Sequence, residues 1–224
     1  IFLCGISLTC LFHDITISGI IYLLLMNIPG KENVTRFTIK PGGYSVTDRE
    51  VILSTLLGSC VSACLYDPFN KIIGMNHFLL SNRRYAKDMP YYITEAGRYG
   101  IHAMEILIND MLNKGAKRGN LRAKAFGGSS LLQPSGEVGN FSCVGKVNAR
   151  FIKDFLENEG IPLVSEDLGG DRGRVIHFYF DKFSVYVRKI QKTVNTKLGL
   201  RAMQFWHKSI ESQEKNISEP DIFV

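Results

Sequence analysis

Apolar residues recur along the chain with two different periods. Several short runs either alternate apolar with polar side chains or are wholly apolar and bounded by Gly, Pro or Asp, which is typical of strands. The predicted strands are Arg36–Ile39, Val51–Leu57, Val61–Tyr66, Lys71–Leu80, Ala123–Phe126, Leu163–Ser165, Val175–Phe180 and Ser184–Val187. The polar and basic stretch 81–92, which follows the strand Lys71–Leu80, predicts a long exposed loop, a kind of loop that is often functional.

Two longer segments repeat apolar residues every three or four positions, which predicts amphipathic helices. The first, Thr94–Lys114, is followed by Gly115, and the second, Val147–Glu159, is followed by Gly160. Glycine commonly follows the last turn of a helix, so both ends are marked. Because strands and helices intermix along the chain, the predicted fold class is α/β (α+β) with a mixed sheet.

The two ends of the chain differ in composition from this body. Residues 1–28 carry one formal charge, Asp14, and no Lys or Arg. A secretory signal would need a basic start, and a membrane span would need about 20 apolar residues, a run that the His-Asp pair interrupts. We therefore interpret residues 1–25 as an apolar extension outside the working protein, residues 26–190 as the domain, and residues 191–224 as a polar tail. No stable membrane insertion is expected.

Composition and charge narrow the class of protein. With 224 residues, 45% hydrophobic and 21% charged, the chain is globular in composition, which excludes a disordered, collagen-like or coiled-coil protein. Its five cysteines are odd in number and sparse, so they predict a reducing, cytoplasmic compartment and no disulfide framework. The net charge of +6 includes a basic run from Lys114 to Lys124. Most such runs are solvated surface. If this one is functional, an acidic protein surface is a better partner than nucleic acid, because the run lacks interleaved aromatic residues.

Cys60 is the candidate nucleophile because of its position. It follows Gly58-Ser59 at a tight turn between two apolar segments, where backbone N–H groups can lie against the sulfur. His77 lies at the end of the next strand, and a histidine beside a thiol makes an activated nucleophile when a third polar group orients the imidazole. Ser54 and Thr55 supply hydroxyl groups just upstream.

Other interpretations of these residues stay open from spacing alone. A lone cysteine near a strand is usually a small buried hydrophobe, and a strand histidine is usually structural. Cys60 and Cys64 form a C-x3-C pair without a second pair, which is a poor zinc signature, so no metal is expected. Gly127-Gly128 permits a turn, and it matches no phosphate-binding loop. His102 is interpreted as structural, and Cys64 and Cys143 as buried.

The residues resemble those of the chemoreceptor glutamine deamidases of bacterial chemotaxis, the CheD family. The resemblance runs in order and with matching spacing over about residues 37–190. Its motifs are LLGSCVSACLYDP at 56–68, GMNHFLL at 74–80, YGIHAM at 99–104, AFGG at 125–128, GIP at 160–162 and EDLGGDRGR at 166–174.

The resemblance implies a site and a fold. The family's catalytic Cys and His carry over to Cys60 and His77. Its catalytic Thr falls on Ser54 in an ungapped alignment, with Thr55 one position later, and adjacent strand residues face opposite sides, so only one of them can orient His77; Ser54 is preferred. The implied fold is a cysteine-hydrolase-like deamidase domain of layered mixed β-sheets packed with helices. The expected substrate-binding residues are Ser59, Asn76, Gly127 and Gly128.

The implied activity is that of a protein-glutamine glutaminase. The enzyme would convert glutamines in the cytoplasmic domains of methyl-accepting chemoreceptors to glutamates and release ammonia, with no cofactor. Two alternatives remain. The chain would act mainly as a non-catalytic adaptor that binds receptors and a chemotaxis phosphatase, which is a further expected partner; or it would be a cysteine protease or transglutaminase with the same catalytic groups.

Overall fold

The computed structural model describes residues 34–80, 95–130, 141–190 and 204, and within them nine strands form two β-sheets. The four-stranded sheet has the order β1-β3-β8-β9. Its strands are β1 (Arg36–Thr38), β3 (Ile52–Leu57), β8 (Arg174–Tyr179) and β9 (Val185–Lys189). The five-stranded sheet has the order β2-β5-β4-β6-β7. Its strands are β2 (Tyr44–Thr47), β5 (Ile72–Asn76), β4 (Val61–Asp67), β6 (Arg122–Gly127) and β7 (Leu163–Leu168).

Both sheets are mixed, as the sequence predicts. In the four-stranded sheet β1 is parallel to β3, and the other pairs are antiparallel. In the five-stranded sheet β6 and β7 are parallel, and the other pairs are antiparallel.

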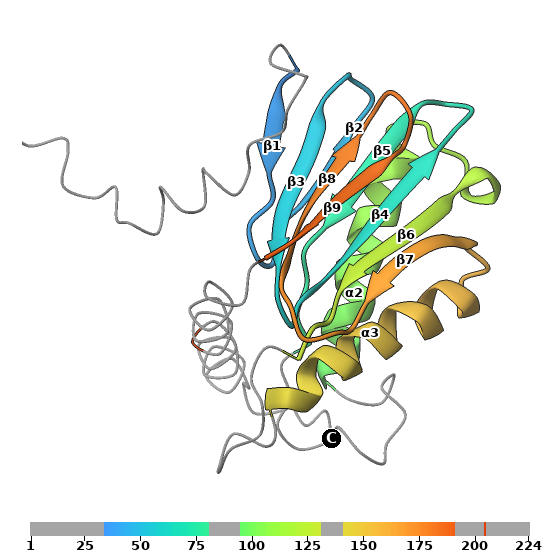
Figure 1. The fold of residues 1–224 in the computed structure, drawn as a ribbon. Helices are drawn as coiled ribbons and strands as arrows, with labels where there is room; N and C mark the ends of the chain where they lie inside the picture. Colours follow the sequence, from blue (N-terminus) through green and yellow to red (C-terminus); the bar gives the residue numbers. More distant parts are fainter. Residues whose placement is uncertain (1–33, 81–94, 131–140, 191–203, 205–224) are drawn as a thin grey trace, which may run out of the picture. The chain divides into compact units, whose positions relative to one another are not determined.

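Two helices cover one face of the five-stranded sheet, and the four-stranded sheet covers the other (Figure 1). The helices are α2 (Glu95–Asn113) and α3 (Phe141–Asn158), and a short 3-10 turn, η2 (Arg118–Asn120), leads into β6. One apolar core lies between the sheet and the helices, and a second lies between the two sheets. Because side chains of a strand point alternately to its two faces, each strand of the five-stranded sheet supplies residues to both cores.

Because side chains alternate along a strand, neighbouring residues of β3 face opposite sides of the four-stranded sheet. Leu53 and Leu57 belong to the core between the sheets, so Thr55, two residues from each, faces the same way. Ser54 faces the other side of the four-stranded sheet, although it is equally buried. The space between the sheets is therefore where the hydroxyl of Thr55, and not that of Ser54, meets groups of the five-stranded sheet.

Most predicted elements are confirmed, and the differences have local causes. The turn-rich stretch before Arg49 contains β2, which the sequence analysis did not predict; the strand is four residues long and is held by its pairing with β5. Helix α3 begins at Phe141, six residues before the predicted start. Gly145 weakens the helical pattern, but a Cβ there would lie 2.5 Å from the Gly128 carbonyl oxygen, so the contact requires glycine.

Several expectations fall on parts of the chain outside the described residues. These are the apolar extension, the loop at 81–92, almost all of the polar tail, and the side chain of Cys143. In the described part of the chain, no helix is both long enough and apolar enough to span a membrane.

Candidate active site

The turn Gly58–Cys60 carries the chain from β3 in one sheet to β4 in the other. Its backbone is fixed by the segment after β6: the N–H of Gly128 donates to the Cys60 carbonyl at 2.7 Å, and the N–H of Ser129 donates to the Gly58 carbonyl at 2.9 Å. Gly127 has φ +111°, and a Cβ there would lie 2.2 Å from the Cys60 carbonyl oxygen. Only glycine allows so close an approach, so the position of the Cys60 turn depends on having glycine at residue 127.

The pairing of β4 with β5 places Cys60 and His77 on one face. Cys64 pairs with Met75, and Val61 pairs with Phe78 in the same register. Continued by one residue, this register sets Cys60 and His77 on the same side as diagonal neighbours, whose α-carbons in antiparallel sheets lie about 7–8 Å apart. That side is the core between the two sheets, to which Cys60 belongs. The expected meeting of the thiol and the imidazole at the strand ends agrees with this register.

Thr55 orients the imidazole of His77 from the opposite sheet. Its Oγ1 lies 2.7 Å from His77 Nδ1 and donates its single proton to the Ile39 carbonyl, also at 2.7 Å. Because that proton is used, Thr55 accepts a hydrogen bond from Nδ1–H, and the neutral ring carries its lone pair on Nε2. His77 Nε2 is buried and has no hydrogen-bond partner. A buried nitrogen with a free lone pair on the face of the thiol is the atom that a general base requires.

The preference for Ser54 as the orienting residue is wrong. Its Oγ lies 2.8 Å from Nδ1 of a second buried histidine, His177 of β8, with which it is paired across the sheet. This pair lies on the outer face of the four-stranded sheet, away from His77. The ungapped alignment points to the correct strand, β3, but to a residue on its other face. A shift of one residue along a strand reverses the direction of the side chain.

Asn76 does not fit the expected substrate-binding role. Its Oδ1 accepts from the Ala63 N–H at 2.9 Å, and its Nδ2 donates to the Ala103 carbonyl at 3.3 Å. The side chain therefore faces α2, on the side of the sheet opposite to His77, and its hydrogen bonds join a strand to a helix. In this structure Asn76 is therefore committed to the strand–helix contact and not to the face that His77 occupies.

The remaining expected substrate-binding residues lie beside Cys60. Gly127 and Gly128 approach the backbone of the Cys60 turn, so their contacts in the structure position the thiol. Ser59 immediately precedes Cys60, and its Oγ is buried without a hydrogen-bond partner. A buried hydroxyl without a partner is costly, which makes Ser59 the candidate for contacting a polar substrate group.

Burial keeps the Cys60 thiol and the His77 imidazole neutral. It raises the pKa of the Cys60 thiol to about 12, an effect that the residue's own backbone N–H partly offsets. Burial also lowers the pKa of His77 to about 4, an effect that the nearby Ile39 carbonyl partly offsets. At neutral pH the site therefore holds a neutral thiol and a neutral imidazole.

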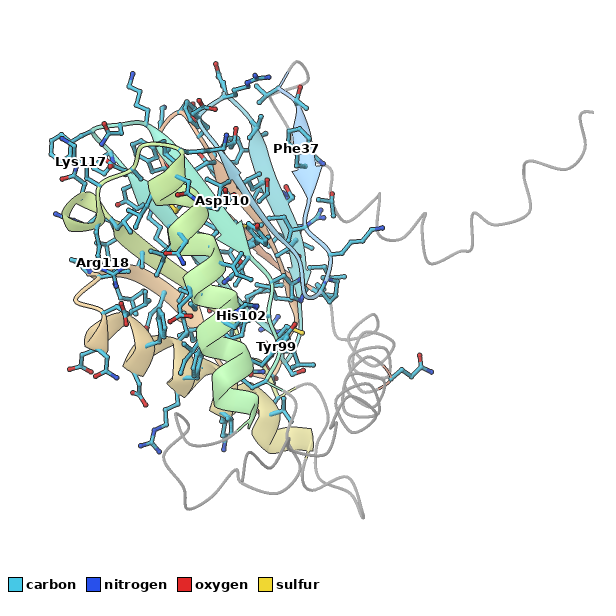
Figure 2. The ribbon with its side chains drawn as sticks, turned by 180° about the vertical axis from the view of Figure 1, so that it is seen from behind. Phe37, Tyr99, His102, Asp110, Lys117 and Arg118 are labelled. Atoms are coloured by element: carbon cyan, nitrogen blue, oxygen red, sulfur yellow. The ribbon has the colours of Figure 1, made fainter. Side chains whose placement is uncertain are left out.

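Two residues near the site carried no predicted role. Tyr99, in the first half of α2, places its hydroxyl 3.6 Å from the position of a Cβ on Gly42, whose N–H donates to the His77 carbonyl (Figure 2). Burial raises the pKa of this phenol, and the negative charge of Cys60 in its ionised form would raise it further. Asn148 of α3 donates from Nδ2 to the Ser59 carbonyl at 2.7 Å. The sequence signal for Tyr99 was its place in the YGIHAM motif, whereas the pattern of α3 does not distinguish Asn148 from other polar helix residues.

Arg174 fixes the loops that support the turn. Its side chain is 1% exposed, Nη1 lies 2.9 Å from a carboxylate oxygen of Asp167, and Nη2 donates to Ser129 Oγ at 2.8 Å. The same guanidinium donates to the Gly169 carbonyl. Because Ser129 in turn bonds Gly58, the buried charge at the start of β8 is connected to the Cys60 turn through one residue.

Side chains of the predicted basic run have different partners. Lys124 donates to the Phe183 carbonyl at 2.6 Å, and Arg118 forms an ion pair with Glu159. Lys117 and Arg118 lie beyond the end of α2, and His102 lies on the exposed side of that helix (Figure 2). Among the described residues, no three His, Cys, Asp or Glu side chains gather as a metal site would need.

Comparison with known proteins identifies the family. The model described as CheD chemotactic sensory transduction matches residues 80–189. Probable chemoreceptor glutamine deamidase CheD 1 of Geobacter sulfurreducens is 54% identical over 186 residues, which cover 83% of this chain and 92% of the relative. CheD 2 of Shewanella oneidensis is 48% identical over 149 residues, or 66% and 73% of the two chains. CheD of Herminiimonas arsenicoxydans is 40% identical over 167 residues, or 75% and 79%.

Similarity to solved structures is much weaker. The hypothetical protein YfiH of Bacillus licheniformis aligns with 18% identity and a TM-score of 0.33 over 55% of this chain and 49% of its own. The sequence relatives, by contrast, match most of both chains at 40% identity or more. The chain belongs to the CheD family of chemoreceptor glutamine deamidases.

Proposed function

We propose that this chain hydrolyses the side-chain amide of glutamines on chemoreceptors, with Cys60 as nucleophile, His77 as general base and acid, and Thr55 as the residue that orients His77. One observation carries the assignment: the Thr55–His77 hydrogen bond leaves a buried Nε2 lone pair on the face that Cys60 occupies. The names of the relatives supply the substrate class, chemoreceptor glutamines.

The first half of the reaction forms a thioester. His77 Nε2 takes the proton from the Cys60 thiol as the sulfur attacks the carboxamide carbon of the glutamine. The backbone N–H of Cys60, which also favours the ionised form of the sulfur, stabilises the developing negative oxygen. His77 then gives its proton to the amide nitrogen, the C–N bond breaks, and ammonia leaves.

The second half restores the enzyme. Water gives a proton to His77 Nε2 while its oxygen attacks the thioester carbon. The C–S bond breaks, the sulfur regains the proton from His77, and a glutamate side chain is released. Each group ends in its initial state, and no redox change or cofactor enters the balance.

The proposed substrate sets the compartment and the partners. Receptor glutamines on cytoplasmic domains require the enzyme in the cytoplasm, in agreement with the sparse cysteines of the sequence. A chemotaxis phosphatase remains a predicted partner. Steering by the basic run toward acidic receptor helices is also a proposal, for which the exposed Lys114 and Lys117 are the candidates.

Mass spectrometry of a purified receptor cytoplasmic fragment tests the function. Incubation with this protein should add about 1 Da at discrete glutamines, and Cys60→Ala should abolish the change. An unchanged receptor in the presence of folded wild-type protein would contradict the deamidase and favour the adaptor. Cleaved or cross-linked receptor would instead indicate the protease or transglutaminase alternative.

A further inference from the structure

The ladder between β4 and β5 is modified next to the active site. Val61 and Phe78 form a complete antiparallel rung: each N–H donates to the other's carbonyl, at 3.0 and 2.9 Å. In such a ladder the next rung of this kind lies two residues further on each strand. Continued beyond Cys60, the register therefore sets Ser59 opposite Leu80, with the Leu80 N–H directed at the Ser59 carbonyl.

A side chain from α3 occupies that rung. Asn148 Oδ1 accepts from the Leu80 N–H at 2.9 Å, and Asn148 Nδ2 donates to the Ser59 carbonyl at 2.7 Å. The amide thus stands between the two groups that would otherwise bond each other directly. Asn148 is fully buried. Its carboxamide keeps both strands hydrogen-bonded while holding them one amide group further apart.

The inserted amide lies at the level of the reacting groups. Cys60 is between the Val61 rung and the Ser59 rung, and His77 is one residue before Phe78 on the facing strand. A separation imposed at Ser59 and Leu80 therefore sets the distance and angle between the thiol and Nε2. A displacement of about 1 Å between reacting groups can lower the reaction rate by two orders of magnitude. A spacer that sets this distance can therefore change the activity strongly.

We propose that Asn148 is a positioning residue that sets the geometry of the Cys60–His77 pair by acting as a spacer in the β4–β5 ladder. This assignment rests on the proposed function, because it takes Cys60 and His77 as the reacting pair. Asn148 touches neither group; it acts through the backbone on either side of them.

Asn148→Asp is the most direct variant. The carboxylate keeps the size of the amide and still accepts from Leu80, but it cannot donate to the Ser59 carbonyl and repels that oxygen. The matched control is Asp67→Ala at the far end of β4. Asp67 is also buried and also bonds backbone N–H groups from separate segments, those of Phe69 and Lys117, at 2.9 Å each.

The readout is the alkylation rate of Cys60 by iodoacetamide, resolved by peptide mass spectrometry, with and without His77→Gln. In the wild type, His77→Gln should slow alkylation at least tenfold. In Asn148→Asp the same change should slow it less than twofold, because the base is no longer aligned with the thiol. Asp67→Ala should keep the full tenfold dependence although its melting temperature falls. Turnover on the receptor fragment should fall at least tenfold in Asn148→Asp.

Each contrary result has one meaning. An unchanged dependence on His77 in Asn148→Asp would overturn the positioning role. If Asn148→Asp does not fold, Asn148→Ser takes its place; failure of both to fold while Asp67→Ala folds would make Asn148 a stability residue and overturn the proposal. Loss of the His77 dependence in the wild type would remove the reacting pair itself, and with it the proposed mechanism. A wild type that alkylates as expected but leaves the receptor unchanged would contradict the proposed function alone.

Discussion

Thr55 Oγ1 and His77 Nδ1 are 2.7 Å apart and join the two β-sheets by one hydrogen bond. Thr55 belongs to β3 in the four-stranded sheet, and His77 follows β5 in the five-stranded sheet. The Thr55 hydroxyl proton is donated to Ile39, so the direction of this hydrogen bond is fixed. The tautomer of the proposed base is therefore set by a residue of the opposite sheet.

Removing the Thr55 hydroxyl should reduce turnover more than removing the hydroxyl of the adjacent Ser54. Thr55→Val keeps the shape of the side chain but leaves the buried Nδ1–H without its hydroxyl partner, which should lower kcat about 10- to 100-fold. Ser54→Ala is the matched control, since it removes a hydroxyl from the adjacent residue and affects only His177. The measurement compares the deamidation rates of the two variants on the receptor fragment. A larger loss in Ser54→Ala would restore the alignment-based assignment.

The pH dependence of activity should differ from that of an ordinary histidine. Because burial lowers the pKa of His77 to about 4, Nε2 keeps its lone pair above about pH 5. We expect kcat/KM to be flat from about pH 5.5 to 8.5 and to fall as the pH approaches 4. Initial rates across this range test it. A half-maximal rate near pH 6.5 would show that His77 titrates as an exposed imidazole.

Stability should fall in acid for the same reason. In the unfolded chain a histidine titrates near 6.5, whereas burial lowers the pKa of both His77 and His177 to about 4. Between these values the unfolded chain binds protons that the folded chain does not, so the free energy of unfolding decreases as the pH falls from 6.5 to 4. The slope should be about 1.4 kcal/mol per pH unit for the proton of His77.

Denaturant titrations of the wild type and His77→Gln at several pH values measure that slope. The variant should show a shallower decrease, by about one proton, because its side chain does not titrate. Equal slopes in the two proteins would mean that His77 is already protonated in the folded chain. His177→Gln should show a change of the same sign without loss of deamidation.

Two glycines with similar backbone angles should respond differently to alanine. Gly127 and Gly115 have φ +111° and +104°, so alanine at either position costs about 1 kcal/mol in backbone strain. Only at Gly127 does the added Cβ meet the Cys60 carbonyl, whereas nothing lies within 4 Å at Gly115. Gly127→Ala should therefore lose most of its activity, and Gly115→Ala should keep it. Similar activities would mean that the Cys60 turn can shift without effect.

The sequence was sufficient to predict most helices and strands, and to predict that Cys60 and His77 lie on neighbouring strands. Apolar periods identified both helices and most strands because those patterns reflect burial on one face. The four-residue β2 was missed because its pairing with β5, rather than its own pattern, holds it in place. Cys60 and His77 could be paired from sequence since their strands are consecutive and antiparallel.

The supporting residues could not be assigned in the same way. Whether Ser54 or Thr55 faces His77 depends on the packing of one sheet on another, which a single-strand pattern does not contain. Asn76 was expected to bind substrate, yet the alternation of side chains along β5 turns it toward α2. Asn148 is 89 residues from Ser59, and such a distant side-chain hydrogen bond leaves no local signature.

The shared position of the site between two sheets has a consequence for biosynthesis. Strand β3, which bears Thr55, is paired on one side with β8, and β8 is paired with β9, which ends at Lys189. A chain still emerging from the ribosome without those strands has Cys60 and His77 but no complete sheet to hold Thr55 against the imidazole. The proposed Cys60–His77–Thr55 site is thus complete only after almost the whole domain has been made.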